Sequence, residues 1–339
     1  MDVRDHVILG RDMQSPEAVP IVLFVFNRPD KTKRVLTALC KQTVCPQQLV
    51  VFADAPRDLA DEVNVNEVRR LVRSIGWVDV HMIERPFNLG CAQNIIRGLA
   101  EVFQSHERAC ILEDDTLPAA SWYEAMCLML DRYVGEPAVF AVGGFPSVKS
   151  NALPKYPFDV MMSPRLSCWG WGTWADRWNG IVADLCHFRN PFGSSARVPT
   201  HAGFDLPGAA QAIENRPDFY WDVPLAVLCL HRGLLHALTR YYLVENIGVD
   251  GSGVHGSTPT EVVTFMKENN RIQDKVPLLF PPTSVRQDVC EAVQTYVRDI
   301  SLATTSRRGR LSILNSVIAV YDVLTRRVRT AARRIVGPG

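Results

Sequence analysis

The sequence has no continuous apolar run of about 20 residues, the length that a helix needs to cross a bilayer. Its first 14 residues are polar and charged and include no apolar core of signal-peptide length. We therefore expect no transmembrane segment. We expect a cytoplasmic protein, or one held peripherally at the inner face of a membrane.

An excess of charge of either sign is also absent, because 37 Lys and Arg residues face 36 Asp and Glu residues. The formal net charge of +1 gives no overall field that favours nucleic acid. Basic and aromatic residues are not interleaved across the main part of the chain, so we expect no nucleic-acid partner. No Gly-x-Gly-x-x-Gly motif follows the first apolar run, which leaves a dinucleotide-binding dehydrogenase with little support.

The nine cysteines are odd in number and include no Cys-x-x-Cys pair. This spacing argues against a disulfide framework and against a zinc site. Most of them lie in apolar runs, so we expect reduced thiols that pack as small hydrophobic side chains in a reducing compartment.

The 339 residues do contain a regular alternation of apolar runs and helical periodicities. The apolar runs are 19–26, 49–53, 78–83 and 109–112. Helical spacing follows each of the first three runs, beginning with a helix that Asp30 could cap. Four such units in about 100 residues predict an open parallel sheet with helices on both faces.

The second half of the chain is less regular. We expect a helix from 121 to about 134, a strand at 139–142, a helix at 223–234, a final strand at 237–244, and two helices beyond about 283. Residues 143–190 are rich in Gly, Pro and Trp, and 187–207 are typical of a loop.

Polar side chains come directly after three of the apolar runs: Asn27-Arg28, Asp54 and Glu113-Asp114-Asp115. Ligands of open parallel sheets bind at the carboxyl ends of the strands. We therefore expect these side chains to face one crevice.

The acidic triplet, Glu113-Asp114-Asp115, places three like charges at the end of a buried strand. Such a cluster is stable only beside a cation or hydrogen-bond donors. Oxygen ligands next to a diphosphate favour Mg²⁺ or Mn²⁺, which would stabilise the departing nucleoside diphosphate. The alternative is a solvated acidic turn that begins the next helix.

The run from Ile111 to Ala119 resembles the acidic motif of the Golgi N-acetylglucosaminyltransferase I family. Three other stretches agree in order: Phe26-Asn27-Arg28, Asp54 and Phe219-Tyr220-Trp221-Asp222. The similarity covers roughly residues 19–256 at the level of motifs. The chain also resembles bacterial glycosyltransferases of the family 2 type, which the motifs do not separate from the first family.

This resemblance implies a GT-A α/β fold, a mostly parallel central sheet flanked by helices, and an inverting transfer from a UDP-sugar with Mn²⁺. It makes Asp115 the metal ligand and Asp222 the general base that deprotonates the acceptor hydroxyl. It gives nucleotide contacts to the following residues: Asn27, Arg28, Asp54, Glu113 and Asp114. The alternative for Asp222 is a helix N-cap before Val223-Pro224, and the two roles are compatible.

The resemblance also suggests a division of the chain. Residues 1–18 would be an extension and 19–282 the GT-A catalytic domain, with a nucleotide half at 19–118 and an acceptor half at 119–282. Residues 283–339 would form a C-terminal helical appendage. We predict a glycosyltransferase with a nucleotide-sugar donor and a glycan or lipid-linked glycan acceptor. The alternatives are a sugar nucleotidyltransferase and a non-catalytic carbohydrate-binding or scaffold protein.

Trp169 and Trp171 are candidates for sugar contacts, since indole faces stack on sugar rings, although large aromatic residues more often pack in a core. Glu245, at the end of a predicted strand, is a candidate acceptor contact. His255, in the Gly-rich segment 250–256, is a candidate metal ligand or an exposed loop residue.

The last predicted helix has apolar residues on one face and several arginines on the other. Such basic amphipathic helices commonly lie on anionic membrane surfaces. A helix packed on the catalytic domain with a solvated Arg face is the alternative.

Overall fold

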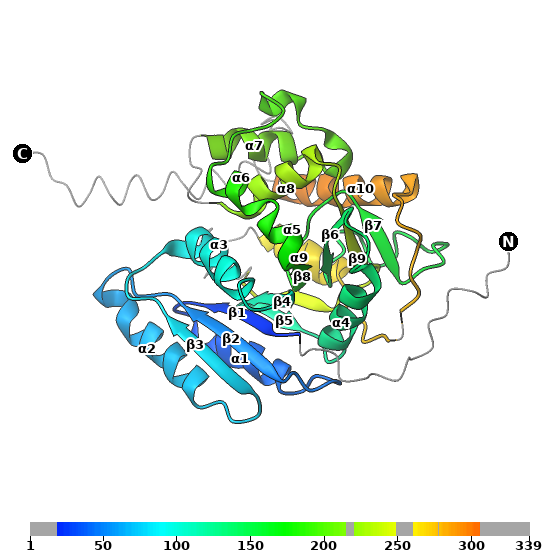
Figure 1. Cartoon of the computed structure of the whole chain (residues 1–339). Helices are drawn as coiled ribbons and strands as arrows, with labels where there is room; N and C mark the ends of the chain where they lie inside the picture. The colour runs from blue at the N-terminus through cyan, green and yellow to red at the C-terminus, as the bar shows by residue number, and fades with distance from the viewer. Residues whose placement is uncertain (1–18, 215–219, 249–259, 277, 306–339) are drawn as a thin grey trace, which may run out of the picture.

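A computed structural model describes residues 19–214, 220–248, 260–276 and 278–305 (Figure 1). Its centre is an eight-stranded sheet in the order β3-β2-β1-β4-β8-β6-β9-β7. The strands are β1 (Ile21–Val25), β2 (Gln48–Ala53), β3 (Asp79–Glu84), β4 (Arg108–Glu113), β6 (Val139–Gly143), β7 (Val160–Ser163), β8 (Trp171–Trp174) and β9 (Leu235–Thr239). Strands β7 and β8 are antiparallel to their neighbours, and the other pairings are parallel.

Helices cover both faces of this sheet. They are α1 (Pro29–Leu39), α2 (Leu59–Arg73), α3 (Gly90–Val102), α4 (Trp122–Tyr133), α5 (Ala175–Asn179), α6 (Val182–Cys186), α7 (Leu206–Glu214), α8 (Asp222–His231), α9 (Thr260–Asn269) and α10 (Gln287–Thr305). Helices α1, α2 and α4 pack on one face, while α3, α5, α6 and α8 pack on the other. Two smaller apolar clusters join α7 to α8 and α10 to β7.

Strand β1 shows why the sheet forms between two helical layers. Ile21, Leu23 and Val25 point into one core, and Val22 and Phe24 point into the other. All five side chains are at most 5% exposed. A strand buried on both faces is a continuous apolar run, which is the pattern in the sequence. The predicted α/β class is confirmed, because a mostly parallel central sheet is flanked by helices on both faces.

Three expectations about individual elements are corrected. The final strand expected at 237–244 is two strands, because the chain turns after Thr239 and β10 (Val244–Asn246) pairs with β5 (Thr116–Pro118) in a separate sheet. Asp30 does not cap α1, because the helix begins one residue earlier at Pro29. The irregular structure expected at 143–190 is wrong, because these residues contain β7, β8, α5 and α6, and helix α9 was not expected either.

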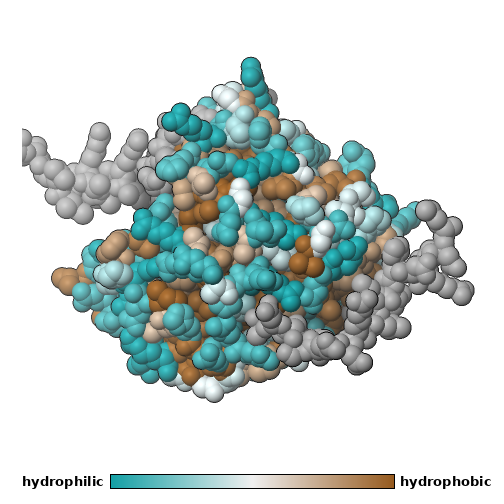
Figure 2. Space-filling model, viewed as in Figure 1, coloured by the Kyte–Doolittle hydropathy of each residue, from teal (hydrophilic) through white to brown (hydrophobic). Residues whose placement is uncertain are grey.

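The surface is mixed in character. On the face shown in Figure 2, hydrophobic residues appear in small groups among hydrophilic ones. Within the described part of the chain, no helix is both long enough and apolar enough to cross a membrane. The expected basic amphipathic helix and the 1–18 extension lie outside the described residues.

Candidate functional site

The candidate site lies at the carboxyl end of β4, where the acidic triplet meets the turn that follows β1. These two strands are parallel neighbours, with Phe24 in register with Glu113. Arg28 Nη1 donates to Asp115 Oδ2 at 2.7 Å, and Arg28 Nη2 donates to Asp114 Oδ1. The Phe26 backbone N–H also donates to Asp114 Oδ2 at 3.2 Å. The structure therefore brings Arg28 and the triplet together, as expected from the strand ends.

The carboxylates of this site are largely withdrawn from water. The Asp114 side chain is 2% exposed, and those of Arg28 and Asp115 are 16% and 14% exposed. Burial raises the pKa of Glu113 well above its ordinary value, and the charge of Asp115 raises it further, against the lowering effect of Arg28. The site thus concentrates negative charge that the Arg28 guanidinium balances in part.

Asp222 joins this cluster from the other half of the chain. It is the first residue of α8, and its charge also raises the pKa of Glu113. Desolvation raises the pKa values of the Cys91 and Cys168 thiols most, and the charges of Glu113 and Asp222 raise them further. The Cys91 Sγ lies 3.8 Å from Glu113 Oε2. Glu113, Asp222 and the two thiols therefore share one region.

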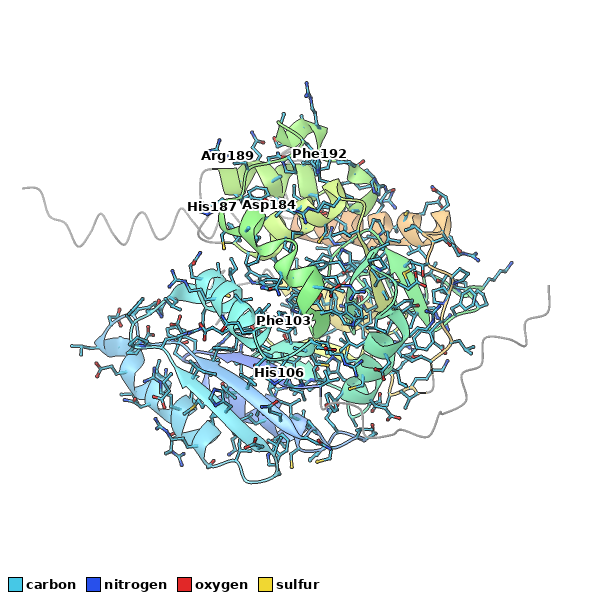
Figure 3. The ribbon with its side chains drawn as sticks, in the orientation of Figure 1. Phe103, His106, Asp184, His187, Arg189 and Phe192 are labelled. Carbon is cyan, nitrogen blue, oxygen red and sulfur yellow. The ribbon has the colours of Figure 1, made fainter. Side chains whose placement is uncertain are left out.

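The two cysteines were not predicted as site residues. The available signal was position: Cys91 is the second residue of α3, which follows the carboxyl end of β3. Cys168 precedes β8, which is antiparallel to β4, so the start of β8 lies at the same edge of the sheet. The opposite, amino-terminal edge is marked by His106, whose Nε2 lies 2.9 Å from the Gln48 Oε1 at the start of β2 (Figure 3).

Asp54 also follows a strand, but its carboxylate accepts hydrogen bonds mainly from backbone N–H groups. Its Oδ1 accepts from the N–H groups of Ala55 and Leu89, both at 2.9 Å. Its Oδ2 accepts from the Gly90 N–H at 2.9 Å and the Asn88 side chain at 3.2 Å. Asp54 is 4% exposed and binds the start of α3. In this arrangement its acceptor positions are filled by the protein.

The Asn27 side chain binds the first turn of α2. Its Nδ2 donates to Asp61 Oδ1 at 2.6 Å, and the Arg57 Nε donates to Asp61 Oδ2, also at 2.6 Å. The bond from Arg57 and then that from Asn27, opposed by burial, lower the pKa of Asp61 to about 2. The Arg57 guanidinium lies 5.2 Å from the centre of the Phe26 ring. Asn27, Arg57 and Asp61 therefore form a second polar cluster beside the turn that follows β1.

Strand β10 brings a third segment to Asp115. The Ile247 N–H donates to the Asp115 carbonyl at 2.8 Å, and the Gly248 N–H donates to Asn246 Oδ1 at 2.7 Å. A Cβ on Gly248 would collide with Asp115 Oδ2, so the backbone here approaches the carboxylate directly. Glu245, the candidate acceptor contact, is exposed on β10. His255 and Phe219 lie outside the described residues.

The two candidate tryptophans occupy different environments. Trp171 is 1% exposed and stacks on Trp221, with ring centroids 5.7 Å apart. Its ring is a core side chain, so a sugar contact by Trp171 is corrected in favour of the packing alternative. Trp169 is partly buried and packs edge-on against Phe145, with centroids 4.6 Å apart.

The expected divalent ion needs oxygen ligands, which Asp114 and Asp115 offer. Among the described residues, no three His, Cys, Asp or Glu side chains are arranged to hold a metal. A Mg²⁺ or Mn²⁺ ion that binds with a nucleotide needs only one or two carboxylates, since phosphate oxygens and water complete its shell. Asp114 and Asp115 supply that number, and the guanidinium between them shows that a cation is accommodated there. The residues fit such an ion.

No protein-family model and no curated protein matches this sequence. Solved structures with some backbone similarity include a mannosyltransferase from Pyrobaculum calidifontis in complex with GDP-Man and Mn²⁺ (15% identity, 94% of this chain and 85% of that chain, TM-score 0.37). Others are residues 1–349 of S. aureus TarS (10%, 89% and 81%, 0.39) and a UDP-glucose pyrophosphorylase from Acinetobacter baumanii (12%, 68% and 88%, 0.35). The TM-scores are all below 0.5, so these similarities carry no weight for function.

Proposed function

We propose that the chain is an inverting glycosyltransferase that uses a divalent metal and a nucleotide-diphosphate sugar, with a UDP-sugar as the first candidate donor. The observation that supports it is the contact of Arg28 with Asp114 and Asp115 at the carboxyl end of β4, with Asp222 close enough for its charge to raise the pKa of Glu113. The acceptor would be a hydroxyl of a glycan or a lipid-linked glycan. The resemblance to the N-acetylglucosaminyltransferase I and family 2-type enzymes supports the same proposal.

The proposed roles follow from the chemistry of each side chain. Asp115 would hold Mn²⁺ or Mg²⁺, which supplies positive charge to the leaving diphosphate when bound. Arg28 would bind phosphate oxygens, since a guanidinium matches their geometry with two donors. Asp222 would accept the proton of the acceptor hydroxyl as that oxygen attacks the anomeric carbon.

The remaining predicted contacts would complete the proposed site. Glu113 and Asp114 would contact the nucleoside, while Asp54 would act through the start of α3 that it caps. Trp169 and Glu245 would contact the acceptor, and His255 remains a proposed additional metal ligand. The domain division at residues 18, 118 and 282 and the membrane-binding role of the C-terminal helix are likewise proposals.

The main alternative is a sugar nucleotidyltransferase, which requires a Gly-rich, basic loop after the first strand to hold a triphosphate. Here Phe26, Asn27 and Arg28 alone connect β1 to α1. The turn is therefore short, and this observation favours the transferase.

The test is a titration of UDP, GDP and their sugar conjugates into the full chain with and without Mn²⁺, followed by a donor-hydrolysis screen. We expect binding of one nucleotide only in the presence of metal and its loss in Asp115→Ala. Asp131→Ala is the matched control, because Asp131 is an exposed carboxylate paired with Arg108. Absence of metal-dependent binding for every nucleotide would overturn the proposal. Pyrophosphate release from UTP and a sugar 1-phosphate would favour the nucleotidyltransferase instead.

A further inference from the structure

Arg28 makes contacts that conflict with the ones proposed for it in catalysis. Its guanidinium contacts Asp115 Oδ2 at 2.7 Å and Asp114 Oδ1 at once, so two of its donor groups are occupied by carboxylates. A metal bound through Asp115 Oδ2 would share one oxygen with this guanidinium. A metal ion and a guanidinium bound to the same oxygen would repel each other strongly, because the site is little exposed to water.

We propose that Arg28 is an exchangeable counterion, which holds Asp114 and Asp115 until a metal and a diphosphate arrive together and then transfers to the phosphates. This inference rests on the proposed function and adds an order of binding to it. A metal ion alone would have to displace Arg28 from Asp115 and leave the little-exposed guanidinium with Asp114 as its one contacting carboxylate. A diphosphate that enters with the metal gives the guanidinium a new partner of suitable geometry.

The backbone around Arg28 is suited to such an exchange. Arg28 directly precedes Pro29, the first residue of α1, and its carbonyl accepts from the Thr32 N–H and hydroxyl, both at 2.9 Å. These bonds fix the main chain, while the guanidinium is held by the two carboxylates. The side chain can therefore change partners without moving β1 or α1.

The anionic partners would not be left without donors after the exchange. Asp114 Oδ2 still accepts from the Phe26 N–H at 3.2 Å. Asp115 would pass from the guanidinium to the metal. The charge of Asp222, which is close enough to raise the pKa of Glu113, adds to the attraction for an incoming divalent ion.

The exchange predicts strong coupling between metal and nucleotide. The test measures free Mn²⁺ by electron paramagnetic resonance as the ion is titrated into the full chain, with and without UDP, or whichever nucleotide the functional test identifies. For the wild type we expect weak binding of Mn²⁺ alone and an affinity about tenfold or more higher with nucleotide. In Arg28→Gln, Mn²⁺ alone should bind about tenfold more tightly, and the gain from nucleotide should fall to about threefold or less.

Arg57→Gln is the matched control, because it removes a nearby guanidinium that contacts Asp61 and not the triplet. It should leave the affinity for Mn²⁺ alone unchanged. Arg28→Lys keeps the charge but has a single donor group, and should bind Mn²⁺ alone with an affinity between the wild type and Arg28→Gln. Thermal unfolding of each variant verifies that it is folded, and Arg28→Lys carries the test if Arg28→Gln is not.

Equal affinities for Mn²⁺ alone in the wild type, Arg28→Gln and Arg28→Lys would overturn the exchange while leaving the proposed function intact. Failure of the wild type to bind any nucleotide with metal would instead overturn the function. In that case, tighter Mn²⁺ binding by Arg28→Gln would still support Arg28 as the counterion of the acidic pair.

Discussion

Asp222 is the first residue of α8, its side chain is partly exposed, and its charge raises the pKa of Glu113. A base in this position would accept a proton from a hydroxyl that enters from solvent. Replacement with Asn keeps the size and hydrogen-bonding capacity of the side chain but removes its basicity. We expect Asp222→Asn to reduce transfer by about 10²–10⁴-fold while the affinity for metal and nucleotide changes little.

The measurement compares transfer rates with nucleotide affinities for the same preparations. Asp176→Asn is the control, because Asp176 is an exposed carboxylate in α5 paired with Arg177. Equal losses of binding and transfer in Asp222→Asn would contradict a role as base and indicate a contact with the donor.

Gly248 is the residue at which β10 meets the acidic triplet. An added Cβ would collide with Asp115 Oδ2 and lie 3.0 Å from Asn246 Oδ1. We expect Gly248→Ala to displace the Asp115 carboxylate and weaken metal-dependent nucleotide binding by about tenfold or more, equivalent to 1.4 kcal/mol. Gly135→Ala is the control, because a Cβ there meets nothing within 4 Å. Unchanged nucleotide affinity in Gly248→Ala would show that this carboxylate does not participate.

At the scale of elements, Gly170 directly precedes β8 and contacts α4, β10 and the residue that follows β6. It has a φ of +63°, and a Cβ on it would collide with Val244 of β10 and lie 2.9 Å from the Trp122 Nε1 of α4. Its carbonyl accepts from that Nε1 at 3.2 Å and from the Gly144 N–H at 2.9 Å. The position therefore requires both the backbone freedom and the small size of glycine.

We expect Gly170→Ala to lower the free energy of unfolding by about 2–4 kcal/mol, from the strained backbone and the overpacked junction together. Urea unfolding followed by circular dichroism measures this change, again with Gly135→Ala as the control. A loss smaller than about 1 kcal/mol would mean that β10 and α4 separate easily, contrary to the packing described.

The elements also show what the sequence could predict. Strand β1 and the strands β2 and β4 beside it are buried on both faces, so each is a continuous apolar run that is recognisable without knowledge of its neighbours. The triplet could be located because it ends such a run. The meeting of Arg28 with Asp114 and Asp115 followed from the parallel order of the strands.

Other features depend on contacts far apart in the sequence, and local patterns do not contain them. The separation of β10 from β9 follows from pairing with β5, which is more than 120 residues earlier. The role of Asp54 depends on the start of α3, from whose N–H groups it accepts hydrogen bonds. A carboxylate after a strand can bind a ligand or cap a helix, and the local sequence is the same in both cases. The expected loop at 187–207 contains two short 3₁₀ turns, Ser195–Arg197 and Thr200–Ala202, and the start of α7.

For the whole molecule, one buried residue links stability to pH. His236 of β9 is 0% exposed, and neither ring nitrogen has a hydrogen-bond partner among the described residues. Burial lowers its pKa to about 3. Between that value and the ordinary pKa of about 6.5, the unfolded chain binds a proton that the folded chain does not. Stability is therefore lost as the pH falls below about 6.5.

His236→Phe removes this titration and preserves a ring that can pack against Phe140, whose centroid lies 6.0 Å from that of the imidazole. From pH 6.5 to 5, the free energy of unfolding of the wild type should fall by about 2 kcal/mol more than that of the variant, at 1.36 kcal/mol per pH unit. Urea unfolding at several pH values measures the difference. Parallel pH profiles would mean that His236 titrates normally in the folded protein.

Strand β8 lies between β4 and β6, although it comes after both in the chain. When the chain is synthesised from its amino terminus, β4 emerges well before the strand that pairs with its outer edge. Until β8 is synthesised, the outer edge of β4 has no partner strand in the sheet. Such an unpaired edge can associate with other chains. A nascent chain that stalls before Trp171 should aggregate, and the crevice should form only after translation has passed Asp222 and β10.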